Sequence, residues 1–199
     1  MVAASPAKAE CVLTATSLIC GTTTTTNTVN AGGSPASDRA YNVTSGATPF
    51  AGSVTAGSTV DGFGLSINDT AAAGAGITFV NDGIIQVNAG NAATANGSAA
   101  LTLWVDSGDI SYSGTGDILN LGTAGSGTWF QHSGIGDITA TFGDDVAGSV
   151  DFTGIYVEHI GTAGNVTVTT AADTTVAAGY TGIWLETGGG LSGDLSLTN

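Results

Sequence analysis

The sequence has 199 residues, of which 42% are hydrophobic and only 9% are charged, and glycine alone occupies 32 positions. Its formal net charge is −14, and Lys8 and Arg39 are the only basic side chains. So few cations can neither neutralise a nucleic-acid backbone nor hold a polybasic contact with anionic lipid, which excludes both kinds of partner.

The composition favours β-structure. The polar residues are mainly Thr, Ser, Asn and Asp rather than Glu and Lys, a set typical of strands and turns. The apolar residues fall in regular short segments, which indicates a folded chain rather than a disordered one. No apolar run approaches the roughly 20 residues of a spanning helix, so we expect no membrane insertion by this chain.

Two cysteines, Cys11 and Cys20, lie near the start of the chain, with no histidine or further cysteine nearby to complete a metal site. They also lack the C-x-x-C spacing of a redox-active pair. We therefore expect a disulfide that closes a small N-terminal loop, which implies an oxidising compartment.

The segment from residue 11 to about 60 is less periodic than the rest and contains a threonine run from Thr22 to Thr26 that matches no repeat. We expect residues 1–60 to form an N-terminal cap with the first irregular coils, because a stack of strands needs its open end covered. Residues 61–199 are expected to form the regular repeats. The chain ends inside a repeat strand, so we expect the repeats to be cut at the C-terminus.

Short apolar segments then recur at a near-constant spacing. In a first series, Ile77, Leu103, Trp129 and Ile155 are evenly spaced, and Ile183 follows after a slightly longer step. A second series, with steps of similar length, runs through Ile85, Ile110, Ile138, Val166 and Leu195. A looser third series runs through segments at Leu119–Leu121, Val150–Phe152 and Val176–Ala178.

Three short strands per repeat, separated by Gly, Asp and Asn turns, predict an all-β fold. We expect a right-handed parallel β-helix, a three-faced β-solenoid with coils of about 25–29 residues. Neighbouring coils, about 4.8 Å apart, would bury the core that no single coil encloses.

Alternation along the first series assigns its side chains to two sides. The inward set is apolar except for Gln131, which is the misfit. One outward column is expected to form an aromatic stripe of Trp104, Phe130, Tyr156 and Trp184. The other outward column is expected to contain Asp106, His132, Glu158 and Glu186.

The aromatic stripe is the strongest candidate for ligand binding or self-association, because a monomer seldom leaves such a surface bare. The alternatives are that a loop covers it, or that the register is shifted and these aromatics line the core. The acidic and histidine column is either a solvated face or a patch that responds to pH or cations.

Acidic residues also gather at the turns. The column Asp109, Asp137, Asn165 and Asp194 is compatible with a calcium ladder, but the G-G-x-G-x-D signature is missing and ordinary Asx turns explain it better. Asp144 and Asp145 form an acidic pair without an evident partner. We expect no metal site, no cofactor and no catalytic residues, and therefore no enzyme.

The Cys11–Cys20 loop, the Thr-rich entry and the loose Gly-Ile-x-Val repeats with Asx-Gly turns resemble the N-terminal part of a type V secretion (autotransporter) passenger domain. The resemblance implies export through the periplasm and the outer membrane, and display on a bacterial cell surface. The expected function is that of an adhesin or self-association scaffold, whose partner is a host-cell or matrix glycan or protein, or another copy of the chain. The alternatives are a β-helix that binds or degrades polysaccharide, and a structural stalk.

Overall fold

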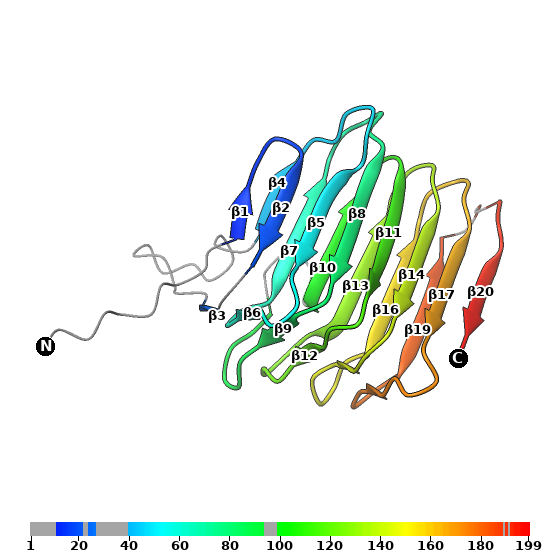
Figure 1. The fold of residues 1–199 in the computed structure, drawn as a ribbon. Coiled ribbons are helices and arrows are strands. Elements are labelled where there is room, and N and C mark those ends of the chain that lie inside the picture. Colours follow the sequence, from blue (N-terminus) through cyan, green and yellow to red (C-terminus); the bar gives the residue numbers. More distant parts are fainter. Residues whose placement is uncertain (1–10, 22–23, 27–39, 94–98, 189, 191) are drawn as a thin grey trace, which may run out of the picture.

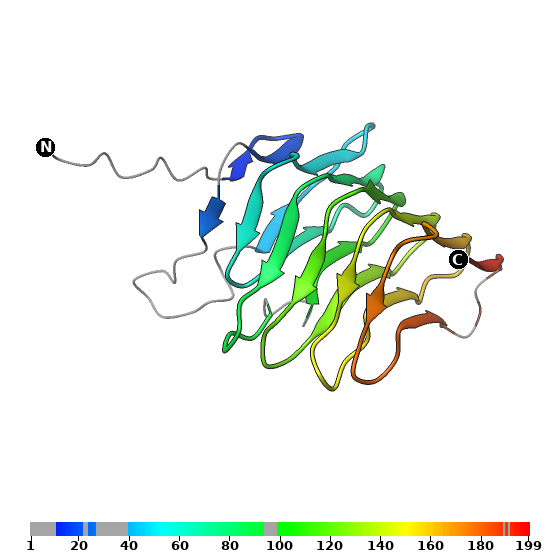
Figure 2. The ribbon, with the colours of Figure 1, turned by 60° about the horizontal axis from the view of Figure 1, so that its bottom comes forward.

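The computed structural model describes residues 11–21, 24–26, 40–93, 99–188, 190 and 192–199. These residues form twenty strands and no helix. The strands make three parallel sheets, and the chain visits sheets A, B and C in turn before it starts the next coil. Successive coils stack side by side, with β1 and β20 at opposite ends of the stack (Figures 1 and 2). The predicted parallel β-solenoid is therefore confirmed.

Sheet A has eight strands, which are parallel except for the antiparallel pair β1 and β2. In spatial order they are β1 (Cys11–Leu13), β2 (Ser17–Cys20), β5 (Phe50–Val54), β8 (Gly76–Asn81), β11 (Asp109–Gly114), β14 (Ile138–Phe142), β17 (Val166–Thr170) and β20 (Leu195–Thr198).

Sheets B and C have six described strands each, and every strand pair within them is parallel. Sheet B consists of β3 (Thr24–Thr26), β6 (Thr59–Asp61), β9 (Ile84–Val87), β12 (Ile118–Asn120), β15 (Val146–Ala147) and β18 (Val176–Ala177). Sheet C consists of β4 (Ala40–Val43), β7 (Leu65–Asp69), β10 (Ala99–Val105), β13 (Ser126–His132), β16 (Ile155–His159) and β19 (Ile183–Thr187).

The first two strands of sheet A are joined by the expected disulfide. Cys11 and Cys20 face each other across β1 and β2 and are bonded. This strand reversal covers the edge of β2 and leaves only the three-residue β1 at the edge of the sheet, and short edge strands limit pairing with other chains. Part of the threonine run does belong to the repeats, because β3 pairs with β6 in sheet B. Thr22 and Thr23 lie outside the described residues. The disulfide indicates an oxidising, extracytoplasmic environment.

The core consists of inward side chains that stack from coil to coil. In sheet A one such buried column consists of Ile77, Ile110, Ile138 and Val166. The second predicted series is thus correct from Ile110 onward. Its first member, Ile85, instead pairs with Ile118 in sheet B, and Ile77, expected in the first series, takes its place. The error arose because short apolar strands recur in all three sheets, so spacing alone did not separate them.

The first series was also wrong by one position at β13. Leu103 pairs with Phe130 rather than with Trp129, so this step is one position longer than the even spacing suggests. Because strand side chains alternate between faces, such a slip turns each of them over. Phe130 and His132 are accordingly fully buried, whereas Trp129 and Gln131 lie on the opposite face. The Gln131 misfit disappears with this register.

No helix long and apolar enough to cross a membrane occurs among the described residues.

Candidate functional site

The outer face of sheet C carries two columns of side chains that differ from the predicted ones. One column consists of Thr102, Trp129, Tyr156 and Trp184. The other consists of Trp104, Gln131, Glu158 and Glu186. Thr102 is buried, so the accessible aromatic part of this first column begins at Trp129 and extends towards the C-terminal coils.

The aromatic rings of this face contact one another in sequence. The ring centroids of Trp129 and Tyr156 are 5.7 Å apart, and those of Tyr156 and Trp184 are 5.8 Å apart with their planes at 62°. Tyr180 joins them from the loop before β19, with its ring centroid 6.0 Å from that of Trp184. Tyr180 is 69% exposed and Trp184 is 40% exposed, so both rings have surface available to a ligand.

Three of these side chains, Tyr156, Tyr180 and Trp184, line a groove of about 260 Å³. We call it the aromatic groove, and its lining residues are Ser126, Asp151, Phe152, Thr153, Tyr156, Tyr180 and Trp184. Strands β13, β16 and β19 contribute Ser126, Tyr156 and Trp184 to it. The loops that lead from sheet B into β16 and β19 supply its wall.

The two loops are held in register by backbone hydrogen bonds. The N–H of Tyr180 donates to the carbonyl of Phe152 at 3.2 Å, and the N–H of Gly154 donates to the carbonyl of Thr181 at 3.0 Å. Phe152 and Tyr180 therefore occupy stacked positions on neighbouring coils. Backbone pairing, rather than side-chain packing alone, fixes the wall of the groove.

Carboxylates flank the aromatic rings. The Tyr156 hydroxyl donates to Glu186 Oε2 at 3.0 Å, and Gln131 Nε2 donates to Glu158 Oε2 at 2.9 Å. Burial and then the Glu186 carboxylate raise the pKa of Glu158 above its usual value. Burial and the hydrogen bond to Glu186 likewise raise the pKa of Tyr156. The pair Glu158 and Glu186 thus places negative charge beside the groove.

Two members of the predicted aromatic stripe lie elsewhere. Trp104 is on the outer face of sheet C and is 37% exposed, but its Nε1 donates to Ser133 Oγ at 2.9 Å and it does not line the groove. Phe130 is in the core, against Tyr112 and Phe142. Tyr156 and Trp184 do lie in one column, and the true third member of that column is Trp129.

The predicted column of Asp106, His132, Glu158 and Glu186 also divides. Glu158 and Glu186 are neighbours across β16 and β19. Asp106 follows the end of β10, and His132 points into the core. There the His132 ring stacks on that of His159, with centroids 4.5 Å apart and planes 7° apart. The slip by one position at β13 explains this correction too.

Both nitrogens of each buried histidine are used by the backbone. His132 Nδ1 accepts the N–H of Gly134 at 3.0 Å, and its Nε2 lies 2.6 Å from the carbonyl oxygen of Gly108. His159 repeats the arrangement with Gly161 and Gly136. Since Nδ1 accepts, Nε2 carries the hydrogen. Both rings are therefore tied into the coil as neutral imidazoles.

The corner column of Asx residues is a hydrogen-bonded ladder. Asp109 Oδ1 accepts the N–H of Asp137 at 2.8 Å, and Asp137 Oδ1 accepts the N–H of Asn165 at 2.7 Å. Asn165 Oδ1 accepts the N–H of Asp194 at 3.0 Å. Each side chain thus satisfies a backbone donor of the next coil, which gives the Asx residues a structural role at this corner.

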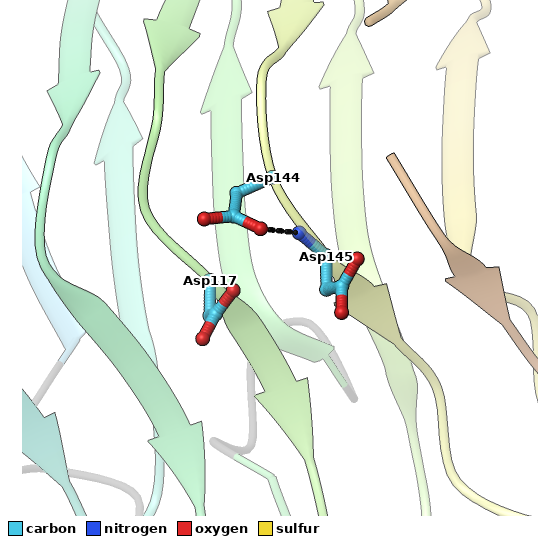
Figure 3. A group of neighbouring side chains, drawn as sticks. All are labelled: Asp117, Asp144 and Asp145. Atoms are coloured by element: carbon cyan, nitrogen blue, oxygen red, sulfur yellow. Dashed lines mark hydrogen bonds between the residues drawn. The ribbon is translucent and has the colours of Figure 1, made fainter. Parts of the chain in front are cut away.

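A second acidic group forms where the chain enters sheet B. Asp144 and Asp145, before β15, meet Asp117, before β12, and the carboxylate oxygens lie within 4.8 Å of one another (Figure 3). Burial and the Asp144 carboxylate raise the pKa of Asp117. Asp145 Oδ1 accepts the N–H of Thr175 at 2.9 Å, and Asp144 Oδ1 accepts the N–H of Asp145 at 2.9 Å. Two of the three carboxylates therefore accept backbone hydrogen bonds.

The chain matches no protein-family model, no curated protein and no solved structure. Its function must therefore be argued from the geometry of its own surface.

Phe152, Tyr180 and Trp129 are the residues of this aromatic face that the sequence did not reveal. Phe152 was expected in a strand of the third series, but that strand is β15 at Val146–Ala147 and Phe152 lies in the loop after it. Tyr180 also lies in a loop, where no periodicity marks a side chain as inward or outward. Trp129 was assigned to the core by the register error. The paired Tyr156 and Trp184, one coil apart, were the signal that located the face.

Proposed function

We propose that this chain is an adhesive β-solenoid module of an exported, surface-displayed protein, and that the aromatic groove is its contact surface. One observation carries the proposal. Aromatic side chains from two strands and two loops converge on one open groove, whereas the corresponding columns of sheet A are lined on the outside by small hydroxyl side chains such as Thr139 and Thr167. Exposed, clustered aromatic surface of this kind is typical of binding sites.

The other features of the fold support a role in presentation. Each coil contacts only its neighbours, so the stack forms a rigid, extended support for a lateral surface. The disulfide at the N-terminal edge is compatible with a location outside the cytoplasm. Export through an outer membrane and display on a bacterial surface remain part of the proposal.

We expect Trp184→Ala to weaken adhesion of the chain at least about tenfold, because tryptophan at the centre of a contact surface often carries much of the binding energy. Latex beads coated with the purified chain would be tested for retention on glycan arrays, on matrix proteins and on one another. Trp104→Ala is the matched control, since it removes an exposed tryptophan from the same sheet outside the groove. Equal adhesion by the wild type and both variants would leave a structural stalk as the better account.

Lowering the pH from 7 to about 5 should strengthen lateral self-association. Protonation reduces repulsion between copies of a chain with a net charge of −14. Glu158 should take up its proton at a higher pH than an ordinary glutamate, because burial and the Glu186 carboxylate raise its pKa. Sedimentation velocity at fixed concentration would measure the change, and Glu158→Gln should reduce it. A sedimentation coefficient that is flat across this range would contradict self-association driven by charge.

A further inference from the structure

The charged side chains that the structure describes around the aromatic groove are all negative. Asp151 lies in its lining, and Glu186 accepts the hydrogen bond of Tyr156, a lining residue. Glu158 is the neighbour of Glu186 on the adjacent strand. Lys8 and Arg39, the two basic residues of the chain, lie outside the described residues, so the described lining contains no lysine or arginine. Anionic ligands such as phosphates, sulfates and uronic acids are therefore disfavoured there.

The rings themselves favour a cation. Four aromatic residues line this single groove: Phe152, Tyr156, Tyr180 and Trp184. The negative face of an aromatic ring attracts a cation that lies within about 6 Å of its centroid, and tryptophan is the strongest of these rings. Trp184 contacts both Tyr156 and Tyr180, with ring centroids 5.8 Å and 6.0 Å from its own, so a cation on the surface of this cluster lies near more than one ring.

The size and lining of the groove select the kind of cation. A metal ion requires several oxygen ligands, and Asp151 supplies the one carboxylate among the described lining residues. A primary ammonium is compact and strongly hydrated, so an aromatic groove of about 260 Å³ fits it poorly. A quaternary ammonium is bulky and weakly hydrated, and aromatic surfaces are the usual means of its recognition.

We infer that the aromatic groove binds a trimethylammonium group, with Trp184, Tyr180 and Tyr156 in contact with the methyl groups and Asp151 balancing the charge. This inference rests on the proposed role of the groove as the contact surface, and it names the ligand class. A choline head group and a trimethylated lysine side chain both present this chemistry.

The test is titration of the whole chain with choline, followed by tryptophan fluorescence and calorimetry. The neutral isostere 3,3-dimethylbutan-1-ol has the same shape without the charge, and we expect it to bind about tenfold more weakly. Trp184→Ala should weaken choline binding about tenfold, and Asp151→Asn should weaken it by a smaller factor. Trp104→Ala should leave it unchanged, and far-ultraviolet circular dichroism would show that each variant is folded.

Phosphatidylcholine vesicles and a peptide carrying trimethyl-lysine separate the two sources of the group. Retention of either one that is lost in Trp184→Ala supports the inference. Equal binding of choline and its neutral isostere would overturn it, as would saturable binding of a neutral oligosaccharide without any binding of choline. If choline does not bind but Trp184→Ala still abolishes adhesion, the ligand class is wrong and the proposed function stands. If neither effect occurs, both are wrong.

Discussion

Gly164→Ala should lower the free energy of unfolding by roughly 3 kcal/mol or more, the sum of backbone strain and overpacking. Gly164 has a φ of 140°, which an alanine adopts only with strain. A Cβ at this position would also overlap the carbonyl oxygen of Gly136 on the preceding coil and lie 2.9 Å from His159 Nε2. Neither neighbour can move freely, because the Gly136 carbonyl faces His159 Nε2 at 2.9 Å.

The same close approach recurs along the corner. A Cβ at Gly136 would overlap the carbonyl of Gly108, and one at Gly193 would overlap that of Gly164. Glycines on four successive coils thus allow the backbone to stack without side chains between them. Gly164→Ala should therefore also weaken the packing between this coil and the coils on either side of it.

Alanine substitutions at two glycines outside this column separate the contribution of backbone strain from that of steric overlap. Gly57 has a φ of 76° but open space around its Cβ position, so Gly57→Ala should cost about 1 kcal/mol from strain alone. Gly46 has open space and no positive φ, so Gly46→Ala should be nearly neutral. Urea denaturation followed by circular dichroism would compare the three variants. A loss at Gly164 no larger than that at Gly57 would refute the steric part of the argument.

The fold was predictable from the sequence because it depends on composition and on approximate spacing. Three short strands per repeat and abundant turn residues tolerate small errors in the position of each strand. The candidate site was less predictable, because the face of a side chain depends on the parity of its position. The step from Leu103 to Phe130 is one position longer than the even step assumed from the sequence, and that difference placed Phe130 and His132 on the wrong side.

The sequence itself contained an indication of this register error. An inward Gln131 between apolar neighbours costs about 1 to 3 kcal/mol unless its amide is paired, and shifting the register by one position removes this cost. The same shift requires an inward histidine, which is also a polar group to be satisfied. In the structure the Gly134 N–H and the Gly108 carbonyl satisfy both nitrogens of His132. A sequence does not show which backbone groups are available to a buried side chain.

Asp117, Asp144 and Asp145 show why contacts between turn residues were not predictable from the sequence. Asp144 and Asp145 are adjacent in the sequence, whereas Asp117 is brought to them by the pairing of β12 with β15. Their proximity depends on the same register that spacing alone left open. Two of these carboxylates accept backbone hydrogen bonds, which gives them a structural role within the stack.

The buried His132 should make the stability of the solenoid depend on pH. Burial lowers the pKa of His132, an effect that its contact with the Gly108 carbonyl and the carboxylates of Asp109 and Asp106 partly oppose. In the unfolded chain a histidine takes up its proton near pH 6.5. The unfolded state therefore binds more protons below about pH 6.5, and the contribution of His132 to stability, complete above that value, declines on acidification.

Carboxylates with raised pKa values act in the opposite direction. The folded state protonates Glu158 and Asp117 at a higher pH than the unfolded state does, so these two groups add stability as the pH falls through their folded pKa values. The total pH profile mixes both effects. The contribution of the histidine must therefore be measured as a difference between the wild type and a variant.

His132→Val, which continues the column begun by Val105, isolates that contribution. At pH 7.5 we expect it to cost about 2 to 4 kcal/mol, because it leaves the Gly108 carbonyl and the Gly134 N–H unpaired in the core. The difference from the wild type should shrink as the pH falls from 7.5 to 5, since only the wild type loses the benefit of a neutral His132. Val157→Ala, a buried change on the next strand without a titrating group, should show a constant difference. If the His132→Val difference is equally constant, the neutral imidazole contributes nothing specific, and shape alone explains why the core holds it.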